Sequence, residues 1–235
     1  MPEWTIAAAQ YAACNRSVAE NVAHHLHFIE AAAKLDCDVL LFPEMSLTGP
    51  GEARHLPVPP DVELLRPLSY AARRHAMTII TGMPVDVDGE RTKGVAIFLP
   101  GASAPLTACQ GQGTCLTPVG CQTGTFDGGA EGCEIDPQAL LLATGTCSEE
   151  CEQLQSVQRL QRFAHRYAIA VLKSSYACGA TSGGSALWDE SGQLIVRADE
   201  GELLLTGRKH DGGWEGDIIP LHENISAIDE CHSGA

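Results

Sequence analysis

The sequence predicts an α/β protein in which buried strands alternate with amphipathic helices. Apolar runs without period-2 alternation, such as residues 38–42 and 77–82, are typical of strands that are covered on both faces. Residues 61–76 instead repeat apolar side chains every three or four positions, which is the spacing of a helix. Strands and helices that alternate in this way favour a layered α/β domain.

Each further element is predicted from the same two patterns. Short apolar runs predict strands over 5–10, 38–42, 77–82, 95–99, 139–145, 168–172 and 201–206, with a hairpin over 183–196. Helical periodicity predicts helices over 18–35, 61–76 and 148–167. Ser17 and Glu20 form a capping box at the start of the first helix, and Asp88–Gly89 is a hairpin turn signal.

Residues 101–138 interrupt this order. They hold no long apolar run and are rich in Gly, Thr, Cys and Gln. An unstructured stretch of this length is uncommon inside a compact domain, so it is functional, mobile or degenerate. We expect one domain over 1–221, with 101–138 as its least regular part, and an irregular tail over 222–235.

Composition and charge exclude some classes of partner. The net charge is −15, and the 15 basic residues form no cluster apart from Arg73–Arg74. Such a chain repels phosphate backbones, so we expect no nucleic-acid partner. No apolar run has membrane-spanning length, and residues 1–5 lack a basic leader region. We therefore expect no membrane partner and a cytoplasmic location.

The chain has ten cysteines, six of them between positions 109 and 151. Without a visible leader they are expected to be reduced thiols. Metal binding by thiols is an alternative, but 109, 115 and 121 are spaced by six and 147 and 151 by four, which are not zinc-ribbon spacings. The triplet His24, His25 and His27 also suggests a metal, but His24 and His27 lack an obvious third ligand nearby, and a packed or solvated role is expected for the triplet.

Glu44 is the principal candidate for chemistry. It follows the buried strand 38–42 directly, after Pro43, which has no N–H and so ends the ladder. The carboxyl end of a strand is where α/β proteins place their reactive groups. We expect Glu44 to be buried at the floor of a pocket; the alternative is a solvated loop carboxylate.

These motifs resemble those of the carbon–nitrogen hydrolase (nitrilase/amidase) superfamily. The resemblance is carried by residues 5–10, 42–49 (Phe-Pro-Glu-Met-Ser-Leu-Thr-Gly), 82–84 and 183–192. It implies a four-layer α-β-β-α sandwich that forms homo-oligomers, commonly dimers. It also implies a hydrolase of small amides or nitriles that needs no cofactor and no metal.

The resemblance further implies a Glu base, a Lys and a Cys nucleophile. Glu44 occupies the Glu position, but Gly111 occupies the Lys position, and no Lys lies between Lys93 and Lys173. Lys173 ends a strand and is a substitute, although lysines usually extend to solvent. Without the lysine, we expect impaired activity.

Cys133 is the candidate nucleophile, because Cys133–Pro137 resembles the segment that carries it. Only five residues separate Cys133 from Ala139, too few for a parallel crossover. Cys147 is therefore a rival, since it precedes the predicted helix and a helix N-terminus favours a thiolate. Two hypotheses follow: an impaired thiol hydrolase, or an inactive homologue that serves binding or assembly.

Overall fold

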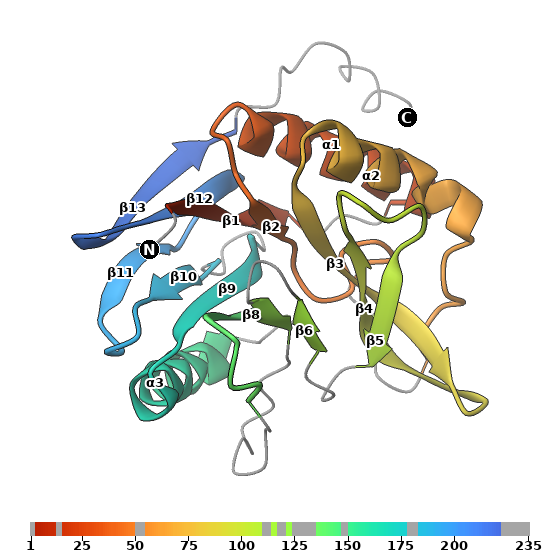
Figure 1. Cartoon of the computed structure of the whole chain (residues 1–235). Coiled ribbons are helices and arrows are strands. Elements are labelled where there is room, and N and C mark those ends of the chain that lie inside the picture. The colour runs from red at the N-terminus through yellow and green to blue at the C-terminus, as the bar shows by residue number, and fades with distance from the viewer. Residues whose placement is uncertain are drawn as a thin grey trace, which may run out of the picture.

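The computed structural model describes residues 3–12, 16–49, 55–109, 114–116, 121–123, 135–146, 150–177 and 183–221. Two sheets face each other, with helices on the outer face of each (Figure 1). This is the α-β-β-α sandwich that the sequence predicts.

The first sheet has the order β5-β4-β3-β2-β1-β12-β13. Its strands are β1 (Trp4–Ala12), β2 (Val39–Leu41), β3 (Thr78–Val87), β4 (Glu90–Phe98), β5 (Leu106–Cys109), β12 (Leu203–His210) and β13 (Gly213–Pro220). Strands β1, β2 and β3 run parallel, so their carboxyl ends meet at one edge. The hairpin turn between β3 and β4 lies at Asp88–Gly89, as predicted, and both residues have positive φ.

The second sheet has the order β6-β7-β8-β9-β10-β11. Its strands are β6 (Thr114–Leu116), β7 (Cys121–Thr123), β8 (Leu141–Thr146), β9 (Ala170–Ala177), β10 (Ser185–Trp188) and β11 (Leu194–Ala198). Strands β7, β8 and β9 are parallel. The ends of β1 and β9 also pair, with Tyr11 opposite Tyr176, and this contact joins the two sheets.

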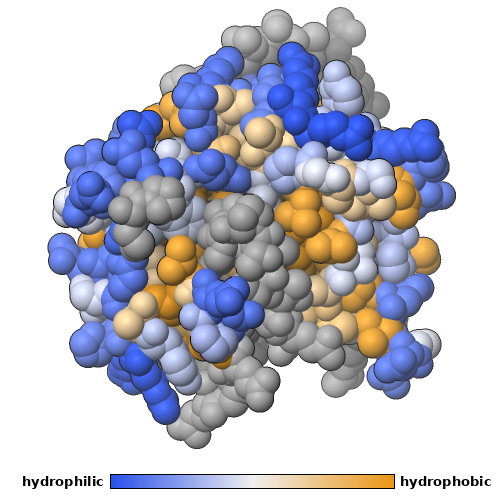
Figure 2. All heavy atoms as spheres, viewed as in Figure 1, coloured by the Kyte–Doolittle hydropathy of each residue, from blue (hydrophilic) through white to orange (hydrophobic). Residues whose placement is uncertain are grey.

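Three apolar clusters hold the layers together. Helices α1 (Val18–Ala33) and α2 (Val62–Arg74) bury Phe28 and Leu68 against the outer face of the first sheet. Helix α3 (Glu150–Tyr167) buries Phe163 against the second sheet, and the inner faces of the two sheets meet around Ile6 and Leu172. In Figure 2 the surface along α1 and α2 is mostly hydrophilic, as expected for helix faces that meet water. The predicted capping box of Ser17 and Glu20 is present.

Four strands were not predicted: β5, β6, β7 and β13. Strand β13 is largely exposed and lacks the pattern of a buried strand, and it forms because β12 offers it a full ladder from Leu203 to His210. Strands β6 and β7 are three residues long each, too short to show a period. Together with β5 they lie inside the segment 101–138, of which residues 110–113, 117–120 and 124–134 lie outside the described residues, as does the tail 222–235.

None of the helices in the described part of the chain is both long and apolar enough to cross a membrane.

Candidate active site

Glu44 lies just after β2, at the edge where the parallel strands of the first sheet end. The Phe42 N–H still donates to the Ile80 carbonyl at 2.8 Å, so the ladder stops at Pro43. The Glu44 side chain is only 11% exposed. It lines a pocket between the two sheets, together with Leu41, Phe42, Pro43, Ile80, Gly82, Gly94, Val95, Ala143 and Gly145. The expectation that Glu44 is buried at a pocket is confirmed.

Two glycines let the backbone of Glu44 pass between the sheets. A Cβ on Gly82 of β3 would collide with the Met45 nitrogen and would lie 2.7 Å from the Glu44 carbonyl carbon. A Cβ on Gly145 of β8 would lie 2.7 Å from the Glu44 nitrogen. Real Cβ atoms do not approach other atoms so closely, so only glycine fits at both positions. The carboxylate therefore emerges from a backbone that both sheets enclose.

A buried histidine holds the loop from the helix side. The His25 Nδ1 lies 2.6 Å from the Asn21 carbonyl, which can only accept, so Nδ1 carries the proton. Its Nε2 then accepts from the Ser46 hydroxyl at 3.0 Å, and the Ser46 oxygen accepts from the Gly82 N–H at 3.2 Å. Burial lowers the pKa of His25 to about 3, so the ring is neutral. The chain of bonds ties α1 to the loop and to β3.

The second sheet fixes the same loop. The Tyr176 hydroxyl of β9 donates to the Glu44 carbonyl at 2.8 Å. The next residue, Met45, has a φ of 57° and is almost fully buried. Such left-handed conformations are strained in residues other than glycine and persist where the surroundings impose them. The loop is thus a rigid support for the Glu44 carboxylate.

Lys93 provides the charge partner of Glu44. Its Nζ lies 2.5 Å from the Glu44 Oε1, and its side chain is 29% exposed. Lys93 belongs to β4 and lies on the same face of that strand as Val95 and Ile97. Both of these residues pack between the sheets. Lys93 was not predicted as a site residue, because the resemblance implies a lysine at position 111. The period-2 pattern of Lys93, Val95 and Ile97 was the signal that places Lys93 on the inner face.

Lys173 does not reach this pocket. It is opposite Thr144 and Ala186 in the second sheet, and Ala186 packs in the cluster under α3. The pocket residues Ala143 and Gly145 flank Thr144 on β8 and so face the other way. The expectation that Lys173 extends to solvent is also wrong, since it is fully buried and its Nζ makes no hydrogen bond among the described residues. Burial, and secondarily the charge of Arg197, lowers its pKa to about 8.

The two candidate nucleophiles, Cys133 and Cys147, lie outside the described residues, as does Gly111. Three other cysteines have described side chains. Cys37 is buried, and burial raises its pKa to about 12, which makes it a poor nucleophile. Cys109 lies on β5 and Cys121 is buried between the sheets on β7.

The partner of β8 in the second sheet shows how the crossover is made. Strand β7 is parallel to β8, with Cys121 opposite Leu141, so residues 124–140 connect them. That connection satisfies the length that a parallel crossover needs. The parallel crossover into β8 thus starts from β7, and Cys133 is part of this connection in the sequence.

No group of three or more His, Cys, Asp or Glu side chains in the described ranges is arranged to hold a metal ion. His25 is packed, as one of the expectations for the histidine triplet had it, and His24 lies 3.2 Å from Glu202.

Comparison with solved structures identifies the fold. A mutant of the Nesterenkonia AN1 amidase, from the nitrilase superfamily, superposes with a TM-score of 0.73 at 16% identity, covering 89% of this chain and 91% of the amidase. A CN-hydrolase superfamily protein from Xanthomonas campestris, with an arsenic adduct in its active site, gives 0.71 at 15% identity, covering 90% and 92%. The glutamine-dependent NAD+ synthetase of Acinetobacter baumannii gives 0.69 at 13% identity, with 97% of this chain but 49% of the synthetase.

Residues 5–100 match the family model of carbon–nitrogen hydrolases. Over these residues the chain is similar to the carbon–nitrogen hydrolases. The matched residues include the whole loop around Glu44 and also Lys93, whereas the segment with Gly111 and Cys133 lies beyond the match.

Proposed function

We propose that this protein hydrolyses a small amide or nitrile, with a cysteine thiol as nucleophile and Glu44 as general base. The observation that carries the proposal is the Glu44 carboxylate, held by both sheets at the pocket and in contact with Lys93. A fixed base at the carboxyl end of a buried strand suits proton transfer from an attacking thiol.

The nucleophile that we propose is Cys133, with Cys147 as its rival. Cys133 belongs to the connection between β7 and β8. The carboxyl end of β8 packs closely against the Glu44 backbone at Gly145. Cys37 is excluded by its buried thiol. We expect turnover to be slow, because position 111 lacks the lysine and a lost donor at a developing charge costs on the order of 10²-fold or more.

The likeness to amidases suggests the substrate class. The Nesterenkonia amidase has been solved in complex with butyramide and, after Michael addition, with acrylamide on its active-site cysteine. Both are small aliphatic amides. We therefore propose an uncharged aliphatic amide of this size as the substrate.

Alkylation by acrylamide, followed by peptide mapping, tests the proposal. We expect one cysteine, Cys133, to be labelled far faster than the other nine, and Cys133→Ala to abolish both this labelling and ammonia release from butyramide. Rapid labelling that moves to the peptide of Cys147 would instead assign the nucleophile to the rival.

A suitable control is Cys109→Ala. Cys109 is opposite Gly94, so the two positions face the same side of the sheet. A Cβ on Gly94 would meet Val85, which packs under the helices and not between the sheets. Its removal should leave labelling and turnover unchanged. Equal, slow labelling of all accessible cysteines, together with no ammonia release, would contradict the proposed function.

A further inference from the structure

The geometry points to Lys93 as a second catalytic residue of the proposed hydrolysis. We propose that its ammonium group holds Glu44 and stabilises the oxyanion of the reacting amide, in place of the lysine that position 111 lacks. The inference rests on the proposed function and names the group that carries the positive charge.

Lys93 reaches the Glu44 carboxylate because of its place on β4. Its neighbours on the same face, Val95 and Ile97, continue the apolar layer between the sheets, and Val95 itself lines the pocket. The ammonium comes within 2.5 Å of the Glu44 Oε1, and the carboxylate is only 11% exposed. An ammonium has three N–H donors and can therefore hold a carboxylate and a substrate oxygen together.

A merely structural ion pair is the alternative. Pairs of this kind at a protein surface contribute only about 0–1 kcal/mol to stability. An apolar residue at position 93 would extend the layer of Val95 and Ile97 without the desolvation of a charge. The lysine instead brings its charge to the one carboxylate among the described residues that line this pocket, which is what a reaction with a developing negative charge requires.

The sheet also explains how a lysine on β4 can serve for one at position 111. Strand β5 pairs with β4 and ends at Cys109, opposite Gly94. The chain thus leaves β5 beside Lys93, two residues before Gly111. Lys93 on β4, which is next to the end of β5, can therefore act on Glu44 in place of a lysine at position 111.

The proposed steps are balanced. The cysteine gives its proton to Glu44, and its sulfur forms a C–S bond with the amide carbon while the carbonyl electron pair moves to oxygen, beside Lys93. The intermediate collapses, the C–N bond breaks, and the proton on Glu44 leaves with the nitrogen as ammonia. Water then gives a proton to Glu44 and attacks the thioester, the C–S bond breaks, and the proton returns to sulfur, which releases the carboxylic acid.

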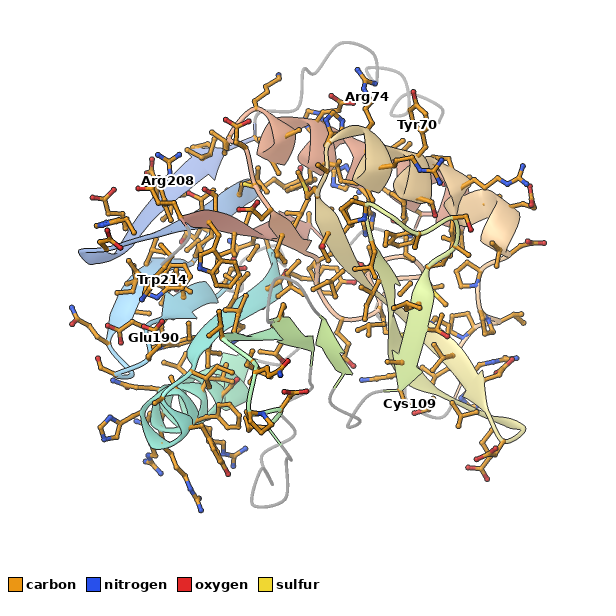
Figure 3. The ribbon with its side chains drawn as sticks, viewed as in Figure 1. Tyr70, Arg74, Cys109, Glu190, Arg208 and Trp214 are labelled. Atoms are coloured by element: carbon orange, nitrogen blue, oxygen red, sulfur yellow. The ribbon has the colours of Figure 1, made fainter. Side chains whose placement is uncertain are left out.

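The test compares Lys93→Met and Lys93→Arg with Lys209→Met as control. Lys209 forms an ion pair of 2.9 Å with Glu190 and is 14% exposed. In Figure 3, Glu190 and Trp214 lie on the opposite side of the molecule from Cys109, which is opposite Gly94, the neighbour of Lys93. The control thus removes an ion pair of similar burial that is remote from the pocket. Ammonia release from butyramide is measured as kcat and KM from pH 5 to pH 9.

We expect Lys93→Met to lower kcat about 10²- to 10³-fold, with a much smaller change in KM. Lys93→Arg should keep part of the activity, Lys209→Met should stay within about twofold of wild type, and adding Gly111→Lys to Lys93→Met should restore at least about tenfold.

Two results would overturn the role of Lys93. One is a Lys93→Met variant with wild-type kcat, and the other is an equal loss of kcat in Lys93→Met and Lys209→Met, which would show a structural effect. A wild-type protein that releases no ammonia and has no rapidly labelled cysteine would instead refute the proposed function itself, so the two failures are distinguishable.

Discussion

Gly82→Ala is expected to destabilise the protein by about 3 kcal/mol, at the upper end of the usual effect of overpacking. The added methyl group would meet backbone atoms of Pro43, Glu44 and Met45. Backbone atoms cannot turn aside as a flexible side chain can. The loop is also held by the Tyr176 hydroxyl and by the bond from the Leu47 N–H to the Gly82 carbonyl at 3.0 Å.

Urea denaturation measures this change, and Gly101→Ala is the matched control. No atom lies within 4 Å of a Cβ at Gly101, and its φ is not positive, so that variant should lose no stability. If Gly82→Ala unfolds at the same urea concentration as the wild type, the backbone of residues 43–45 does not pack as closely against Gly82 of β3 as described.

Acid should destabilise the protein through His25. The ring has a pKa of about 3 in the fold and about 6.5 in the unfolded chain. Between these values the unfolded chain binds one proton more, so stability falls as the pH falls below 6.5. The loss is about 1.4 kcal/mol per pH unit and reaches about 5 kcal/mol near pH 3.

The measurement is urea unfolding at pH 7, 5.5 and 4.5. His25→Gln should be less stable than wild type at pH 7, since its ring contacts Phe42 and bridges Asn21 and Ser46. Its stability should nevertheless fall less steeply with acid, because the variant takes up about one proton fewer on unfolding. The control is His27→Gln, on the exposed face of the same helix, which should keep the wild-type slope. The same slope in His25→Gln would mean that His25 is not buried in its neutral form.

Local sequence patterns were sufficient to predict most of the fold. Strand β2 could be predicted from its apolar run, and helix α1 from its apolar periodicity and its capping box. These signals depend only on residues that are near one another in the sequence. Strand β13 does not, because its residues are mostly exposed and it forms by pairing with β12. Strands β6 and β7 are too short for any period to be visible.

The candidate site was predictable only in part. Glu44 could be placed because a buried strand and a proline precede it directly. Its support could not, because the contacts of Gly82 and Gly145 join segments that are distant in the sequence. Lys93 was missed for a similar reason: a motif fixes a position in the chain, whereas a charge can reach a pocket from a neighbouring strand.

The most direct measurement of the central claim is ammonia release from butyramide by wild-type protein and by Glu44→Gln. Glutamine keeps the size of the side chain but removes the base, so the loop that holds it should remain folded. The account predicts measurable release by the wild type and a loss of at least about 10²-fold in Glu44→Gln, within the range for a general base. Equal rates in the two proteins, or no release by either, would contradict it.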